Sequence, residues 1–159
     1  MPLLSRPAPR APRPRRPAPA LPALAPAGAS VGVRLGDGVV TGLPEGRLCV
    51  GGGKTLVVSD LHLEKGSAYA VRGQMLPPYD THAALVKLAT LMERLEPEIV
   101  VSLGDSFHDG GGVARMAPRD RALLKGMIGG CDWIWVEGNH DGRAPETQGG
   151  GVRGGVEIG

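Results

Sequence analysis

The chain has 159 residues, of which 26 are glycine and 15 are proline, so residues that break helices and strands are unusually common. Residues 1–30 hold nine of the prolines, eight alanines, five arginines and no acidic residue. The net charge of +2 therefore divides into +5 on this segment and −3 on the remaining 129 residues. That balance excludes a strongly basic domain that coats nucleic acid. No run of residues reaches the ~20 apolar positions that a membrane span requires, so no membrane partner is expected.

The composition predicts one small domain preceded by an arm. Residues 1–30 are predicted to form a disordered Pro/Ala/Arg-rich arm, because proline removes backbone donors and few apolar side chains are available for burial. Residues 31–159 are long enough for a single domain and too short for two. With only five aromatic residues in the chain, its core is expected to consist of Leu, Val, Ile and Met. Cys49 and Cys131 stand far apart without a CxxC motif, which suits a reducing compartment and predicts a cytoplasmic location.

Short apolar runs alternate with helical spacing along the domain. Runs of β-branched residues that end at a polar residue predict buried strands, and apolar residues at every third or fourth position predict helices. After Asp141 no periodic segment remains, and no further helix or strand is expected. The predicted elements, in chain order, are β-like segments at Val31–Leu35 and Arg47–Val50, a strand at Thr55–Ser59, a helix from Tyr79 to Leu95 capped by Asp80 or Thr81, a strand at Glu98–Leu103, a weaker helix at Arg119–Met127 and a strand at Asp132–Glu137.

This alternation predicts an α/β fold with strands buried on both faces. Ligands of such sheets bind at the carboxyl ends of the strands, where the polar loops meet. Each of the three main predicted strands is followed by residues that can ligate a metal ion. These three positions carry most of the functional information in the sequence.

Asp60 and His62 follow the first of these strands. In an extended segment, residues i and i+2 point to the same side, so both side chains can reach one cation. A carboxylate with a neutral imidazole suits Mn, Fe or Zn better than Ca. Taken alone, however, such a pair is more often ordinary loop polarity.

Gly104 and Asp105 follow the second strand, and His108 comes three residues later. The glycine lets the backbone pass close to a ligand, and the carboxylate can bridge two cations with its two oxygens. A single Gly-Asp pair at the end of a strand is weak evidence by itself.

Gly138, Asn139, His140 and Asp141 follow the third strand. An amide oxygen can ligate a metal while the adjacent imidazole faces the substrate. Alone, a Gly-Asn turn with an incidental histidine is the simpler interpretation. Three successive strands that all end in this way make chance agreement improbable.

Other charged residues lie near the same predicted edge. Lys65 and Arg72 can hold a phosphate-containing substrate, or they are ordinary solvated charges. Three of the four histidines fall inside the three motifs, and the fourth, His82, is expected to be solvated in the first turn of its helix.

The order D-x-H, G-D-x-x-H, G-N-H-D resembles the calcineurin-like metallophosphoesterases. Two longer strings, Asp60-Leu61-His62-Leu63-Glu64-Lys65-Gly66 and Leu76-Pro77-Pro78-Tyr79-Asp80-Thr81, are similar to one subgroup, the bacterial ligase-associated DNA damage response endonucleases, also described as phosphoesterases. The resemblance covers about residues 40–158. It implies an αββα-type sandwich, with residues 31–159 as its N-terminal part. The C-terminal part is expected to be missing, because the family completes its site with later histidines, including a G-H-x-H motif, and none follows His140.

The resemblance also implies a set of metal ligands. Two divalent metal ions are expected, Mn2+ first, with Fe or Zn as alternatives. Asp60 and His62 would ligate one ion, Asp105 would bridge both, and Asn139 would ligate the second. Two ions so placed can activate water near neutral pH and stabilise both in-line oxygens of a phosphoryl transfer.

Three further residues have implied catalytic roles. His140 would stabilise the transferring phosphoryl group or protonate the leaving oxygen, and Asp141 and His108 would orient these groups. The expected function is that of a metal-dependent phosphoesterase that hydrolyses phosphodiesters, DNA among them, by attack of a metal-bound hydroxide. A functional association with a DNA ligase or helicase is implied by the subgroup.

Two alternatives stay open. One is a non-catalytic fragment that binds a metal or a partner, and the other is a phosphomonoesterase or nucleotide hydrolase that uses the same site. The arginine-rich arm weakly favours DNA, because basic arms add nonspecific affinity for phosphates.

Overall fold

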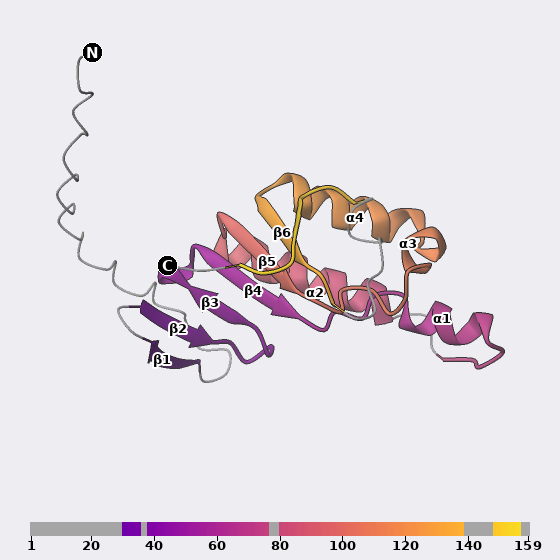
Figure 1. Ribbon diagram of the computed structural model, residues 1–159, viewed down its shortest axis with the longest axis horizontal. Coiled ribbons are helices and arrows are strands. Elements are labelled where there is room, and N and C mark those ends of the chain that lie inside the picture. Colours follow the sequence, from indigo (N-terminus) through magenta and orange to yellow (C-terminus); the bar gives the residue numbers. More distant parts are fainter. Residues whose placement is uncertain (1–29, 36–37, 77–79, 139–147, 157–159) are drawn as a thin grey trace, which may run out of the picture.

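A mixed sheet with helices forms the part of the chain that the computed structural model describes, residues 30–35, 38–76, 80–138 and 148–156 (Figure 1). Strands that follow each other in the chain are neighbours in the sheet. The first to fourth strands pair antiparallel, and the fourth to seventh strands pair parallel. The strands are β1 (Val31–Leu35), β2 (Gly38–Gly42), β3 (Leu48–Val50), β4 (Thr55–Ser59), β5 (Ile99–Leu103), β6 (Asp132–Val136) and β7 (Gly151–Arg153).

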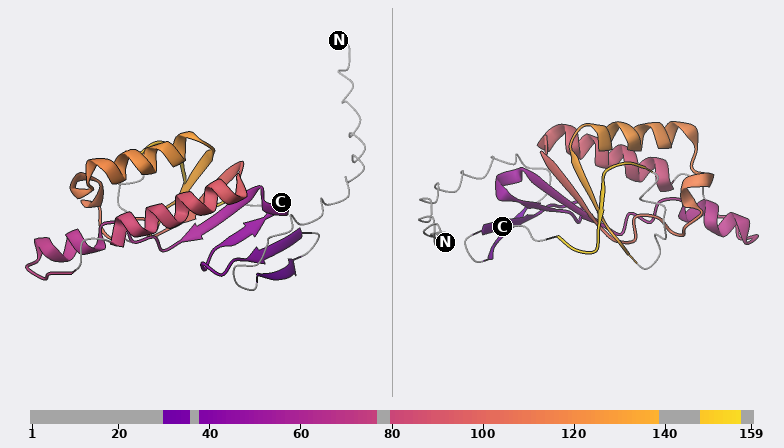
Figure 2. Two further views of the ribbon diagram at one scale, coloured as in Figure 1. Left: turned by 180° about the vertical axis from the view of Figure 1, so that it is seen from behind. Right: turned by 45° about the horizontal axis from the view of Figure 1, so that its top comes forward.

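Two long helices, α2 (Asp80–Leu95) and α4 (Pro118–Gly129), lie side by side over one face of the sheet (Figure 2). The helix α2 buries Leu85, Leu88 and Leu91, which recur every third residue and form its apolar stripe. Three short elements complete the described fold: η1 (Gly51–Gly53), α1 (Lys65–Val71) and α3 (Gly112–Arg115). None of the helices in the described segments is long and apolar enough to cross a bilayer.

Aromatic side chains lie at the centre of the core, which corrects the expectation of a core built from aliphatic residues and methionine alone. Trp133 and Trp135 of β6 and Phe107 after β5 are fully buried. The ring centroids of the two tryptophans lie 5.1 Å apart, and those of Phe107 and Trp135 lie 6.2 Å apart. Few aromatic residues therefore suffice, because they are concentrated where the sheet meets the helices. The aliphatic residues of β4, β5, α2 and α4 surround them.

The predicted strands at β4, β5 and β6 and the helices α2 and α4 are confirmed to within a few residues at each end. The expectation of no further element after Asp141 is wrong, because β7 pairs parallel with β6. Its three residues are too short to show a pattern. A side chain outside β7 fixes the segment, since Trp135 Nε1 donates a hydrogen bond to the carbonyl of Gly149 at 2.8 Å.

Candidate metal centre

The loops after β4, β5 and β6 meet at one edge of the sheet. The parallel register pairs Ser59 with Leu103 and Leu103 with Val136, so the next residues of all three strands emerge side by side. Two of these loops begin with Asp60 and Gly104, and the third contains Gly138. The edge is the one that the sequence predicts for ligand binding, and it is where the chain places its metal-capable residues.

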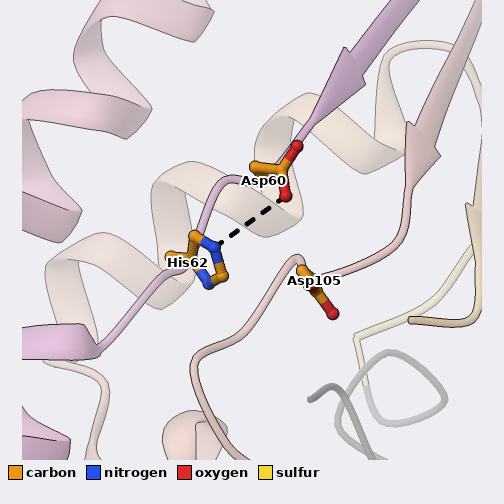
Figure 3. A group of neighbouring side chains, drawn as sticks. All are labelled: Asp60, His62 and Asp105. Carbon is orange, nitrogen blue, oxygen red and sulfur yellow. Dashed lines mark ion pairs between the residues drawn. The ribbon is translucent and has the colours of Figure 1, made fainter. Parts of the chain in front are cut away.

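Asp60, His62 and Asp105 converge at this edge (Figure 3). One ligand atom from each lies within 4.8 Å of the others, and Asp60 Oδ1 is 3.9 Å from His62 Nε2. The Asp60 side chain is 67% exposed and that of His62 35% exposed, so solvent and substrate can reach the group. Two carboxylates and one imidazole form a donor set that suits Mn, Fe or Zn. The residues present therefore fit a divalent transition-metal ion.

The backbone conformation of these residues differs from the extended one that the sequence predicts. The segment after β4 is not extended: φ is 50° at Asp60 and 44° at His62, and it is 47° at Asp105. Left-handed conformations are uncommon for residues other than glycine and cost on the order of 1–3 kcal/mol each. The prediction that an extended D-x-H segment points both side chains to one side is therefore wrong in its geometry. The side chains still converge because the loop coils back after the strand.

Backbone hydrogen bonds between the two loops hold these conformations. The amide of His62 donates to the carbonyl of Asp105 at 3.0 Å, and the amide of Leu63 donates to Ser106 at 2.9 Å. In the opposite direction, the amide of His108 donates to the carbonyl of Leu63 at 2.9 Å. The parallel pairing of β4 and β5 is thus interrupted at the candidate ligands and resumes beyond them, at the bridge between Leu63 and Phe107.

Glycine is required where the third loop approaches Asp105. A Cβ atom on Gly138 would lie 2.1 Å from the Asp105 nitrogen and 2.6 Å from its Oδ1. Gly104, whose φ is 59°, lies so close to Gly138 that its own Cβ would be 3.0 Å from the Gly138 Cα. The glycines that open the G-D and G-N motifs therefore have a shared steric reason: they bring the two loops into direct backbone contact.

His108 lies beside the candidate ligands. Its ring centroid is 5.9 Å from that of His62 and 5.5 Å from that of Tyr69 in α1. The structure thus brings one of the three predicted catalytic residues next to the metal-capable group. Tyr69 was not predicted, because it lies between the two family-like strings and in neither of them.

A chain of polar contacts supports the group from α1 and α3. The hydroxyl of Ser67 lies 2.6 Å from Oε2 of the buried Glu64, and Arg115 Nε donates to the same hydroxyl at 3.0 Å. Arg115 also pairs with Asp109 Oδ1 at 2.6 Å. Burial by itself would raise the pKa of Asp109, but the hydrogen bonds from Arg115 and from the Gly111 amide outweigh it and hold the pKa below its usual range. This support was not predicted from the sequence.

The remaining predicted residues, Asn139, His140 and Asp141, fall within residues 139–147, outside the described residues. Their roles stay predictions. The last described residue before them, Gly138, lies against Asp105.

The histidine of α2, His82, keeps 41% of its side chain exposed, in line with the expectation that it is solvated. Its Nδ1 also lies 2.6 Å from Oδ1 of Asp120, a carboxylate in α4 that is only 4% exposed, a contact that the sequence does not predict. The pair joins the two helices and lies outside the candidate site.

Asp80 and Thr81, one of which is predicted to cap the helix that they begin, bind the start of α1. Asp80 Oδ2 accepts a hydrogen bond from the Gly66 amide at 2.9 Å, and Thr81 Oγ1 accepts one from the Glu64 amide at 2.7 Å. The other oxygen of Asp80 accepts from the Thr81 amide. The two strings that carry the family resemblance therefore meet in space, since one supplies the candidate ligands and the other anchors the loop that bears them.

A cavity of about 560 Å³ lies elsewhere, between α2 and α4 at their carboxyl-terminal ends. Met92, Leu123 and Met127 are among its lining residues, and none of the predicted site residues contributes to it. It is remote from the metal-capable group.

Comparisons with known proteins bear on the family and the fold. The family model described as calcineurin-like phosphoesterase matches residues 53–155, well over half of the chain. Among solved structures, the chain is similar to the Pseudomonas putida nuclease MPE, with a TM-score of 0.59 and 21% sequence identity. The alignment covers 79% of this chain and 60% of the nuclease, so the chain spans less than two thirds of that protein's length. At this identity the likeness shows the fold, and the predicted α/β metallophosphoesterase fold is confirmed. A search of curated proteins found no match.

Proposed function

The chain belongs to the calcineurin-like phosphoesterase family, and from that premise we propose that it hydrolyses phosphate esters at a divalent metal centre. The observation that carries the proposal is the convergence of Asp60, His62 and Asp105 on two hydrogen-bonded loops at the carboxyl edge of the parallel strands. The subgroup we propose is that of the ligase-associated DNA damage response endonucleases, for which the two long strings around α1 are the support.

Two divalent ions bound there, with Mn2+ as the proposed species, would supply charge stabilisation to the transferring phosphoryl oxygens and activate water for in-line attack. We propose Asp60 and His62 as ligands of one ion, Asn139 as a ligand of the other, and Asp105 as the ligand shared by both. A shared ligand suits Asp105, because its backbone is held by the β4 loop on one side and contacts Gly138 of the third loop on the other.

The chain's own residues would then handle the substrate and the proton. His140 is proposed to stabilise the phosphoryl group or to protonate the leaving oxygen, and Asp141 is proposed to orient it. His108 is proposed as a positioning group, a role supported by its ring contacts with His62 and Tyr69.

The proposed substrate is a phosphodiester, with DNA as the polymer. The structural neighbour is named a nuclease, and the exposed Asp60 side chain can be reached by a substrate. We propose that residues 1–30 form an arm outside the domain and that the protein acts in the cytoplasm, in functional association with a DNA ligase or helicase.

The deciding experiment compares hydrolysis of bis-p-nitrophenyl phosphate, a diester, with that of p-nitrophenyl phosphate, a monoester, in the presence of Mn2+. The Asp105→Asn variant is expected to lose activity by about 100-fold or more, since even outer-shell residues of metal sites are worth about 10- to 100-fold. Asp132→Asn, which changes an exposed carboxylate at the start of β6, is the matched control.

The two alternatives predict different results. Faster hydrolysis of the monoester than of the diester would indicate a phosphomonoesterase. Calorimetric titration with Mn2+ tests the other alternative. Stoichiometric Mn2+ binding that depends on Asp105, without turnover of either ester, would indicate a non-catalytic metal-binding chain. Equal activity of Asp105→Asn and the unmodified chain would contradict the proposed centre itself.

A further inference from the structure

The helix α1 and the turn after it extend away from the body of the molecule, beside the candidate centre (Figures 1 and 2). We name residues 65–76 the α1 projection. It begins three residues after His62, and its Tyr69 ring lies 5.5 Å from the ring of His108. Any molecule that contacts the candidate ligands from this side therefore also meets the α1 projection.

The α1 projection is fixed at its base. Amides of Glu64 and Gly66 donate to the side chains of Thr81 and Asp80, at 2.7 and 2.9 Å. Arg115 holds Ser67 from the α3 side. The helix thus starts from an anchored point of the fold.

The far end of the α1 projection is also ordered. Gly73 has a φ of 78°, its amide donates to Ala70, and the amide of Gln74 donates to Tyr69. These two bonds and the left-handed glycine form a Schellman motif, which stops a helix in a defined geometry. The residues that follow are therefore presented by a structured turn.

This ordered turn holds apolar side chains out in solvent. Met75 is 89% exposed and Val71 is 74% exposed, and Leu76 is also exposed. Contiguous exposed apolar side chains mark interaction sites, whereas single ones are normal on a surface, and Met75 and Leu76 are adjacent in the chain.

The charge of the α1 projection points to a polyanion. Lys65 and Arg72 are both exposed, and residues 65–76 contain no acidic residue. Seven residues of helix at about 1.5 Å each separate the two cations by about 10 Å along the axis. That distance matches the rise of about three nucleotides of a B-form strand, at about 3.4 Å each.

We propose that the α1 projection is a docking surface for a polynucleotide, with Lys65 and Arg72 on backbone phosphates and Met75 and Leu76 against sugars and bases. The inference deepens the proposed function and rests on it for the identity of the substrate. A protein partner would use the apolar side chains equally well. The polynucleotide is favoured because the only charges on the surface are cationic and the neighbouring centre is itself proposed to act on phosphate.

Binding without turnover tests the docking surface. Fluorescence anisotropy of a fluorescein-labelled DNA of about 20 nucleotides, single-stranded and duplex, is measured in EDTA over a series of salt concentrations. Lys65→Ala/Arg72→Ala is expected to weaken binding about 10-fold and to lower the slope of log K against log salt by about 1.5, since each lost phosphate contact removes about 0.7–0.9. Lys87→Ala/Lys125→Ala, which removes two exposed cations from α2 and α4, is the matched control and should change both quantities less.

A second variant tests the apolar side chains. Met75→Ser/Leu76→Ser should weaken binding several-fold without changing the salt slope, because no charge is lost. The docking surface is wrong if Lys65→Ala/Arg72→Ala binds as the control does. It is also wrong if Met75→Ser/Leu76→Ser leaves DNA binding intact and instead changes the mass measured by light scattering, which would assign the surface to a protein contact.

The outcomes for the docking surface and for the catalytic proposal are separable. DNA binding that depends on the α1 projection, in a chain that hydrolyses neither ester, would overturn the proposed reaction and leave the surface standing. Ester hydrolysis that depends on Asp105, with DNA binding indifferent to Lys65 and Arg72, would overturn the surface alone.

Discussion

Gly138 decides how closely the third loop can approach the candidate ligands. The distances that a Cβ atom would have from the nitrogen and Oδ1 of Asp105 are far inside van der Waals contact. Neither group can move easily, because one is backbone and the other is a candidate ligand atom. Gly138 thus acts on the site through the position of Asp105.

Replacing this glycine should harm the site more than the fold. Gly138→Ala is expected to lower the affinity for Mn2+ by about 10- to 100-fold, the range typical of residues that support metal ligands. Calorimetric titration with Mn2+ measures the loss, and circular dichroism checks that the sheet is retained.

Gly126→Ala in α4 is the matched control for this substitution. A Cβ atom there meets nothing within 4 Å, and alanine favours a helix over glycine by up to about 1 kcal/mol. The control should therefore bind Mn2+ unchanged and unfold at slightly higher urea. Full Mn2+ affinity in Gly138→Ala would show that the loop can yield and would contradict the steric account.

The types of the candidate ligands could be predicted from the sequence, but their backbone conformations could not. Asp60, His62 and Asp105 stand out because each follows an apolar run. Their positive φ angles depend on hydrogen bonds from the opposite loop, more than 40 positions away in the chain. No local pattern encodes such a bond, so the extended geometry expected for the D-x-H segment was wrong.

At the scale of elements, a polar chain joins α1 to α3 behind the site. It runs from Glu64 through Ser67 and Arg115 to Asp109. Arg115 is the central member, since it contacts both Ser67 and Asp109. The stability contributed by the Arg115–Asp109 pair should depend on pH, because the pKa of Asp109 in the folded chain lies below its ordinary value.

The sign of this dependence follows from the lowered pKa. The folded chain holds the Asp109 proton less tightly than the unfolded chain does, so the stabilisation is present above the ordinary value of 3.8 and is lost as the pH falls through the folded value. Arg115→Gln should lower the free energy of unfolding by about 1–2 kcal/mol at neutral pH, as expected for a charged hydrogen bond. Urea denaturation from pH 7 down to the acid limit of folding measures how this difference narrows.

Lys125→Gln, which alters an exposed lysine of α4, serves as the control. A difference between Arg115→Gln and the unmodified chain that stayed constant through acid pH would assign the effect to packing rather than to the ion pair.

The elements that could not be predicted are those fixed by distant contacts. The helix α1 owes its start to Asp80 and Thr81, and β7 owes its place to Trp135. The strands β4 and β5 could be predicted because their burial on both faces leaves a continuous apolar run. In β6 only the two tryptophans are buried, and its short apolar run still predicts a strand. The burial pattern of a strand can be predicted from its own residues, whereas a hydrogen bond from another element cannot.

Over the whole molecule, the core residues of the described part and the five arginines of residues 1–30 occupy different stretches of the sequence. Within the described residues the core cluster begins at Leu43, and it centres on the tryptophans of β6. The five arginines of residues 1–30 lie before all of it in the chain. The arm is therefore expected to add charge without adding stability.

Removing residues 2–29 tests this separation. The free energy of unfolding should stay unchanged, because no core residue of the described part is lost. The salt dependence of DNA binding should become shallower, because five cations are removed. Urea denaturation followed by the fluorescence of the buried tryptophans measures the first, and anisotropy the second. A clear loss of stability would show that the arm packs on the domain.

The paired loops of the site have a consequence for the lifetime of a bound ion. The amides of His62, Leu63 and His108 donate to carbonyls of the facing loop, so neither loop can open by itself without breaking bonds of the other. Hydrogen exchange at these three amides should accordingly rise and fall together, as one cooperative unit. An ion held by Asp60, His62 and Asp105 would keep all three ligand backbones in place between such joint openings, while the exposed Asp60 side chain stays open to exchange with solvent.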